Sequence, residues 1–168
     1  MDRLWAPWRD KYVRQDNKEK KGCVFCKAFR SKKDQKNFVL FRFKHSFSIL
    51  NIYPYQNGHI LISPNKHLND LDKFNDAELL DVQQHLVYVK KCLKLVLKPQ
   101  GFNVGLNLGR AAGAGVPGHV HYHIVPRWVG DFNFMPLFSN TKVISQSLES
   151  LHERLIDADK KLSRTKRK

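Results

Sequence analysis

Three histidines alternate with apolar residues in the run His119-Val120-His121-Tyr122-His123-Ile124-Val125. Successive side chains of a β-strand point to opposite faces. The run therefore predicts a strand over His119–Val125, with the three histidines on one face and Val120, Tyr122 and Ile124 packed on the other. A Gly-rich loop, residues 109–118, comes directly before it. A surface strand with incidental histidines, or an adventitious metal site, is the alternative interpretation, but the pattern beside a Gly-rich loop favours a functional site.

The surrounding sequence predicts further strands joined by short turns, and helices that lie apart from them in the chain. Strands are expected over Phe38–Phe43, Ser46–Leu50, His59–Ile62 and Phe102–Leu108. A long helix should follow the capping pair Asn75 and Glu78 and stop at Pro99, because apolar residues recur between them every three or four positions. A C-terminal helix is expected from the spacing of Ile144, Leu148, Leu151 and Leu155. This order is typical of a five-stranded antiparallel α+β domain.

The net charge of +15 over 168 residues lies mainly at the two ends. Residues 1–36 hold 12 basic and 5 acidic side chains and residues 160–168 hold six basic and no acidic ones, which leaves +2 for the 123 residues between. We expect one domain over residues 1–160, with residues 1–36 as a basic N-terminal layer that is irregular over Lys18–Lys36, and residues 161–168 as a disordered basic tail. The near-neutral middle argues against a uniformly basic nucleic-acid-binding module.

Composition excludes several classes of protein. A hydrophobic content of 42% argues against wholesale disorder, and no apolar run approaches the roughly 20 residues of a membrane-spanning helix. The charged start is unlike a signal peptide, so we expect a cytoplasmic protein. Three cysteines do not make a disulfide framework, and the pair Cys23-Val24-Phe25-Cys26 suits metal or redox chemistry in a reducing compartment.

A face of neutral imidazoles can act on phosphorus. An imidazole with an ordinary pKa of about 6.5 is mostly neutral at pH 7 and offers an unprotonated nitrogen. Its attack on a nucleotide phosphate gives a nucleotidyl-histidine, which splits one displacement into two easier ones. Neighbouring histidines can donate hydrogen bonds to the phosphate or protonate the leaving group, and glycine backbone can approach it closely.

The histidine run resembles the signature of the histidine triad (HIT) superfamily of nucleotide hydrolases and transferases, in which three histidines alternate with apolar residues. The resemblance extends from about Cys23 to Pro136. The flanking segments Trp5–Arg9 and Pro126–Pro136 are similar to the branch of fragile-histidine-triad proteins and bacterial diadenosine tetraphosphate phosphorylases. The resemblance implies a HIT-like fold whose sheet joins that of a second copy in a homodimer.

Site roles follow from the same resemblance. It implies that His121 is the nucleophile and that His123 and His59 contact phosphate or orient it, with His119 also in the catalytic row. Asn51 would hold a ribose hydroxyl, while Asn107 and Gly109 would line the phosphate path. Simpler roles as turn residues stay open for His59 and Asn51.

One segment departs from the family pattern. Many members have Gly-Gln-Ser/Thr-Val before the triad, where this chain has Ala114-Gly115-Val116-Pro117-Gly118. Backbone amides such as that of Gly115, the Arg110 side chain or a partner subunit would then have to bind the leaving group. A solvated loop arginine is the alternative for Arg110.

A structural zinc site is the second implication of the resemblance. Several members complete a Cys-x-x-Cys pair with two histidines, and the matching ligands are Cys23, Cys26, His67 and His119. A reduced thiol pair without metal is the alternative. If His119 binds zinc, its catalytic part is indirect. Magnesium could accompany a polyphosphate substrate, although no carboxylate cluster is arranged to hold it.

The leading hypothesis is an enzyme that cleaves dinucleoside polyphosphates, such as diadenosine tetraphosphate or triphosphate, at the α-phosphate. Whether phosphate or water resolves the intermediate stays open, and the flanking motifs favour the phosphorylase. A nucleoside phosphoramidase is the nearer alternative, and a non-catalytic nucleic-acid-binding protein the alternative of another class.

Overall fold

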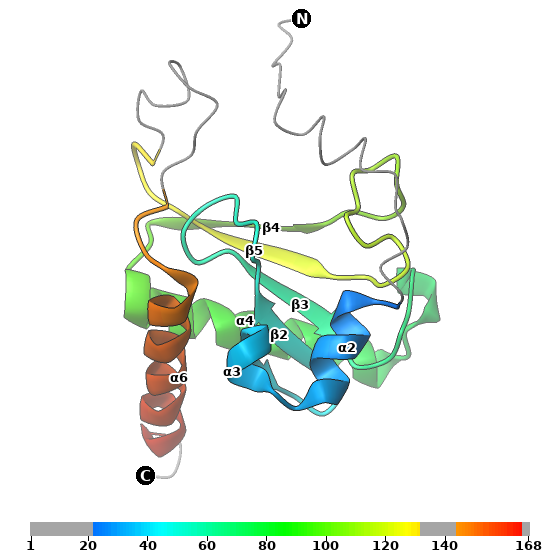
Figure 1. Ribbon diagram of the computed structural model, residues 1–168, viewed down its shortest axis with the longest axis horizontal. Coiled ribbons are helices and arrows are strands. Elements are labelled where there is room, and N and C mark those ends of the chain that lie inside the picture. Colours follow the sequence, from blue (N-terminus) through cyan, green and yellow to red (C-terminus); the bar gives the residue numbers. More distant parts are fainter. Residues whose placement is uncertain (1–21, 132–143, 166–168) are drawn as a thin grey trace, which may run out of the picture.

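The computed structural model describes residues 22–131 and 144–165 (Figure 1). The predicted basic layer therefore lies outside the described residues over 1–21. The branch motifs Trp5–Arg9 and residues 132–136 lie there too. The elements in chain order are α2 (Val24–Ser31), α3 (Asp34–Asn37), β1 (Val39–Arg42), β2 (Ser46–Leu50), β3 (Ile60–Pro64), a short 3₁₀ turn (Leu71–Lys73), α4 (Asp76–Leu97), β4 (Gly101–Leu106), β5 (Tyr122–Arg127) and α6 (Leu148–Thr165).

The strands form one sheet in the order β1-β2-β3-β5-β4, and every neighbouring pair is antiparallel. The predicted five-stranded antiparallel α+β fold is confirmed. One boundary differs in a way that matters for the site: β5 begins at Tyr122 and not at His119. The backbone N–H of His119 closes a turn on Val116 O at 3.1 Å, and the N–H of Val120 donates to Leu68 O at 2.7 Å, so neither joins the ladder.

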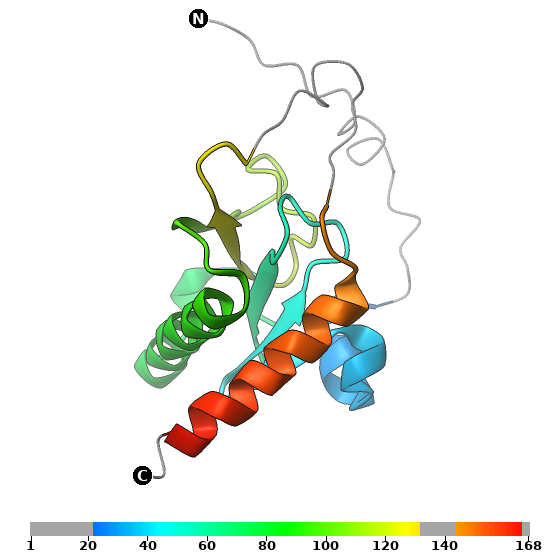
Figure 2. The same cartoon turned by 90° about the vertical axis from the view of Figure 1, so that its left-hand side faces the viewer.

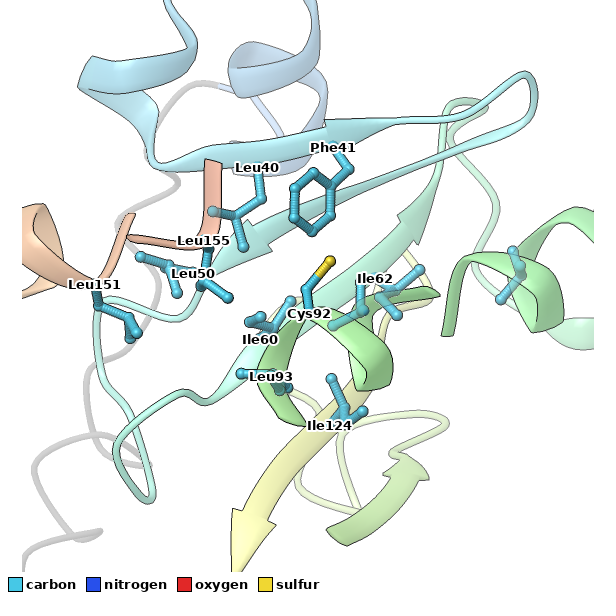
Figure 3. Packing of buried hydrophobic residues seen from close by; sticks show 12 residues of the cluster. Leu40, Phe41, Leu50, Ile60, Ile62, Cys92, Leu93, Ile124, Leu151 and Leu155 are labelled. Atoms are coloured by element: carbon cyan, nitrogen blue, oxygen red, sulfur yellow. The ribbon is translucent and has the colours of Figure 1, made fainter. Parts of the chain in front are cut away.

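One face of the sheet is covered by α4 and α6, which pack against each other (Figures 1 and 2). The predicted capping box of α4 is present, since Asn75 Oδ1 accepts from the N–H of Glu78 and the Glu78 carboxylate accepts from the N–H of Asn75. Figure 3 shows the hydrophobic core of this face, into which Cys92 points as a small buried residue. Its buried members are Leu40, Phe41, Leu50, Ile60, Ile62, Val82, Val89, Cys92, Leu93, Ile124, Leu151 and Leu155.

The opposite face is covered by α2. Its Phe25 and Ala28 pack on Val39 and Phe47 of the sheet in a second, smaller buried cluster. The irregular layer predicted over Lys18–Lys36 is therefore wrong in its described part, where two short helices form. The packing of apolar side chains on one side of α2 stabilises the helix in an otherwise polar segment.

The C-terminal end also differs from expectation. Helix α6 continues to Thr165, so the first part of the predicted disordered tail, residues 161–168, is helical. Leu162 packs against the core of the α4 face and explains the extension. Across the described ranges, none of the helices is both long and apolar enough to cross a membrane.

Candidate active site and metal centre

The chemical side chains gather on the face covered by α2. Along β5, Ile124 enters the core under α4, so the alternation places His123 on the other face, as the sequence predicted. His123 lies between Leu61 of β3 and Gly105 of β4 in the ladder. His59, directly before β3, is 1% exposed and comes beside it. Residues far apart in the chain therefore meet near the middle of the sheet.

His121 is held in one tautomer by the backbone. Its Nδ1 lies 2.8 Å from the carbonyl oxygen of His119, and a carbonyl can only accept, so Nδ1 carries the proton. The lone pair then resides on Nε2. The side chain is 5% exposed, and its ring packs against Phe25 with a centroid distance of 4.9 Å.

His59 and His123 form a directional pair. The backbone N–H of Tyr55 donates to His59 Nδ1 at 3.1 Å, so the proton of His59 is on Nε2. That N–H points to His123 Nδ1 at 2.9 Å, which makes Nδ1 of His123 the acceptor and Nε2 its protonated nitrogen. His123 Nε2 is buried and has no hydrogen-bond partner among the described residues. The pair therefore ends in a free N–H donor beside His121, whose ring centroid is 5.0 Å from that of His123.

Burial keeps these imidazoles neutral. Desolvation lowers the pKa of His123 to about 4, with repulsion from His121 as the second cause. Desolvation likewise lowers the pKa of His121, although the hydrogen bond to His119 opposes it. At pH 7 the site thus offers one unprotonated nitrogen and one N–H donor without a positive charge on either ring.

The other predicted substrate-binding residues are distributed unevenly. Asn51 lies at the site, where its Nδ2 approaches His59 Nδ1 at 3.2 Å and its Oδ1 accepts from the N–H of Tyr53. Asn107 instead donates to Gly113 O at 3.4 Å within the β4–β5 loop. The three other loop residues, Gly109, Arg110 and Gly115, are exposed, and within the described part of the chain none of them forms a hydrogen bond with a histidine.

The four predicted metal ligands are brought together. One ligand atom from each of Cys23, Cys26, His67 and His119 lies within 4.8 Å of all the others. Cys23 Sγ is 3.2 Å and Cys26 Sγ 3.6 Å from His119 Nδ1, and Cys26 Sγ is 3.3 Å from His67 Nδ1. Tetrahedral zinc with bonds of 2.0 to 2.3 Å separates its ligands by about 3.3 to 3.8 Å, so the donor set fits such an ion.

The surroundings of His119 suit a ligand as well. Its Nε2 donates to the carbonyl oxygen of Pro64 at 3.0 Å, which leaves Nδ1 unprotonated and directed at the two sulfurs. Burial lowers the pKa of His119 to about 4, so the ring is neutral. Beside it, the loop of His67 is held by the bond from Val120 to Leu68 and by an ion pair between Lys66 and the buried Glu78.

Two side chains of the site were not anticipated from the sequence. Phe25, between the two cysteines, contacts both His119 and His121. Tyr55 stacks on His123 with an interplanar angle of 7° and is 50% exposed. The signals available were an aromatic residue inside the Cys-x-x-Cys pair and one four residues before His59, but neither spacing indicates a partner across the sheet.

Comparison with known proteins agrees with this geometry. The model of the HIT domain family matches residues 32–129. An AP-4-A phosphorylase of Mycobacterium tuberculosis (strain CDC 1551 / Oshkosh) is 34% identical over 154 residues, which cover 88% of this chain and 79% of the relative. An adenosine 5'-monophosphoramidase of Saccharomyces cerevisiae is 34% identical over 105 residues, covering 62% of each chain.

The fold has counterparts among solved structures. A zinc-bound histidine triad family protein from Mycobacterium smegmatis superimposes with a TM-score of 0.70 at 25% identity, covering 86% of this chain and 97% of that one. A histidine triad nucleotide-binding protein from Sulfolobus tokodaii gives 0.69 at 25% identity, with 84% and 95% covered. These matches confirm the resemblance predicted from the histidine run.

Proposed function

Because this chain belongs to the HIT domain family, we propose that it is an enzyme that cleaves dinucleoside polyphosphates at the α-phosphate through a nucleotidyl intermediate on His121. Diadenosine tetraphosphate is the substrate we infer. The relative with the widest coverage reported above is an AP-4-A phosphorylase, and the site residues of this chain suit the same chemistry.

The observation that carries the proposal is the tautomer of His121. Because His121 Nδ1 keeps its proton and donates it in a hydrogen bond to His119 O, the Nε2 lone pair can attack phosphorus without prior proton transfer. In the first step the new N–P bond forms, the bond from phosphorus to the bridging oxygen breaks, and that oxygen leaves with the electron pair. From diadenosine tetraphosphate, AMP stays on His121 and ATP leaves.

His123 stabilises the negative charge that develops on the phosphate and leaving-group oxygens in that step. Its Nε2–H, which has no partner in the described part of the chain, donates to a phosphate oxygen or to the leaving oxygen, and His59 fixes this direction by donating to the other side of the ring. A neutral donor binds the anionic group without first giving up a proton. In the second step, the oxygen of phosphate or water attacks the phosphorus, and the electron pair of the N–P bond returns to Nε2.

The acceptor decides the products. Phosphate as acceptor gives ADP and water gives AMP, each beside the ATP of the first step. We propose phosphate, because the phosphorylase relative covers 88% of this chain and the phosphoramidase only 62%. Incubation with diadenosine tetraphosphate, with and without phosphate, followed by chromatography, tests this: ADP that appears only with phosphate supports phosphorolysis, and AMP in both conditions contradicts it.

Zinc is the metal we propose for the Cys23, Cys26, His67 and His119 cluster. Two thiolates and two imidazoles in this spacing favour zinc over magnesium or calcium, and the bound ion would tie the start of α2 to the sheet. Burial and the neighbouring Cys23 thiol raise the pKa of Cys26, so a bound cation would stabilise the Cys26 thiolate. Metal analysis of protein purified without chelator should find about one zinc per chain.

A homodimer in the cytoplasm is part of the same proposal. Strand β4 lies at the edge of the sheet, and its Val104 is 47% exposed, so a second copy could pair along it. Light scattering at several concentrations tests the dimer; a mass of one chain at all of them rejects it. A substrate-borne magnesium ion and steering of anionic nucleotides by the basic ends remain further predictions.

A further inference from the structure

Phe25 occupies an unusual place between the metal cluster and the proposed nucleophile. It is the second residue of α2, lies between the two cysteines, and is 3% exposed. Its ring centroid is 4.9 Å from that of His121 and 5.3 Å from that of His119. Phe25 is therefore a buried core residue under α2 that also contacts one residue of the metal cluster, His119, and the proposed nucleophile, His121.

His121 needs such a neighbour. One hydrogen bond holds its Nδ1 to His119 O, and a single bond leaves the ring free to tilt about that contact. The tilt is limited by packing, which comes from Phe25 and from the ring of His123. Because a phenyl ring has no hydrogen-bonding group, Phe25 restrains the imidazole without engaging the Nε2 lone pair.

The position of Phe25 depends in turn on the cluster. The turn that carries it begins with the bond from Lys27 N to Cys23 O, and the side chain of the N-cap residue Cys23 makes no capping hydrogen bond within the described structure. The sulfurs on either side of Phe25 face His119 and His67, which belong to other parts of the fold. A metal ion bound by the four ligands would hold both flanks of Phe25 at once.

We propose that Phe25 is a positioning residue that couples the Cys/His cluster to His121. The occupied cluster fixes the first turn of α2, and the Phe25 ring then keeps the His121 imidazole in the orientation for attack. This inference rests on the proposed role of His121 as nucleophile.

The test compares Phe25→Leu with Phe29→Leu in protein purified without chelator. Phe29 is on the same helix and packs in the same cluster, with its ring 5.2 Å from that of Phe47, but among the described residues its ring contacts do not include a histidine. We expect Phe25→Leu to lower kcat about 10-fold or more, since small misplacements of reacting groups are costly, with KM and metal content nearly unchanged. Phe29→Leu should lose similar thermal stability and keep kcat within about 2-fold. Equal losses in both variants, or an unchanged kcat in Phe25→Leu, would overturn the inference.

Imidazole ¹⁵N chemical shifts give a second readout that needs no turnover, because they report which ring nitrogen carries the proton. The wild type should show His121 as one tautomer with the proton on Nδ1. Phe25→Leu, and wild type stripped of metal, should both show averaging between tautomers, while Phe29→Leu should not. An unperturbed His121 in the stripped protein rejects the coupling. If the wild type does not cleave diadenosine tetraphosphate, the proposed function fails, and the ¹⁵N shifts still decide the coupling.

If Phe25→Leu is too unstable to assay, Phe25→Met replaces it. Methionine fills a similar volume without a flat ring, so the same loss of kcat is expected.

Discussion

Two buried histidine networks lie on opposite faces of the sheet, and they end differently. On the α4 face, His85 Nδ1 donates to Ser46 Oγ, whose hydroxyl donates to Asp81, while Ser48 Oγ donates to His85 Nε2. On the α2 face, the hydrogen bonds from Tyr55 through His59 end at the Nε2–H of His123, which has no partner among residues 22–131 and 144–165. Burial alone therefore does not distinguish a histidine with a functional role from a structural one. The distinguishing feature is a ring nitrogen that the described protein leaves without a hydrogen-bond partner.

Removing a histidine should therefore have different consequences in the two networks. The imidazole rings of His85 and His123 are both neutral, because burial lowers the pKa of His85 to about 3 and the pKa of His123 to about 4. In the closed network each imidazole nitrogen satisfies a partner, so its loss costs stability. In the open network one buried donor is left for a ligand, and its loss costs activity.

The largest expected effect is on turnover. His123→Ala should lower kcat by about 10² to 10⁴, the usual range for a lost proton donor or acceptor in catalysis. His85→Ala, the matched change in the closed network, should leave kcat per folded molecule nearly unchanged. Steady-state kinetics on diadenosine tetraphosphate measures both, and a similar loss of kcat in the two variants would erase the distinction.

The stability effects should be reversed. His85→Ala leaves a cavity and removes the partners of two buried hydroxyls, so we expect a loss of about 3 kcal/mol in the free energy of unfolding. His123→Ala should cost about 1 kcal/mol, because the site is partly open to solvent. Urea unfolding monitored by fluorescence provides the comparison, and a larger loss for His123→Ala speaks against it.

The smallest effect is on pH dependence. The folded-state pKa of His85 lies below its unfolded value of about 6.5, so the unfolded chain binds the proton first as pH falls. The stability contributed by neutral His85 is fully present above pH 6.5 and is lost between about 6.5 and 3, by up to about 1.4 kcal/mol per pH unit. His85→Gln should reduce the slope of stability against pH by that amount between pH 6 and 5; identical slopes in variant and wild type would contradict the closed neutral network.

Parts of the fold were predictable because local patterns determine them. Alternation placed His123 and Ile124 on opposite faces, and the capping pair Asn75 and Glu78 marked the start of α4. The start of β5 was wrong by three residues because His119 N–H is used in a turn and not in the ladder. The helices before β1 were missed because the packing of Phe25 and Ala28 on the sheet is a tertiary effect, which short polar segments do not reveal.

Some features of the site could likewise be predicted from the sequence, and others could not. The family resemblance grouped Cys23, Cys26, His67 and His119 correctly, since ligand spacing is visible in sequence once the pattern is known. The direction of the pair from His59 to His123 could not be predicted, because it depends on a backbone N–H of a loop. The same limit applies to Phe25, whose contact with His121 joins residues 96 positions apart.

The proposed mechanism depends most on His121 as the nucleophile, and one measurement tests this role directly. Brief mixing of the wild type with diadenosine tetraphosphate, followed by intact-mass analysis at neutral to alkaline pH, should reveal protein that carries one AMP group. His121→Ala should carry none and show no turnover, while its fold and nucleotide binding persist. Adenylylation or substantial turnover in the folded His121→Ala variant would contradict the account.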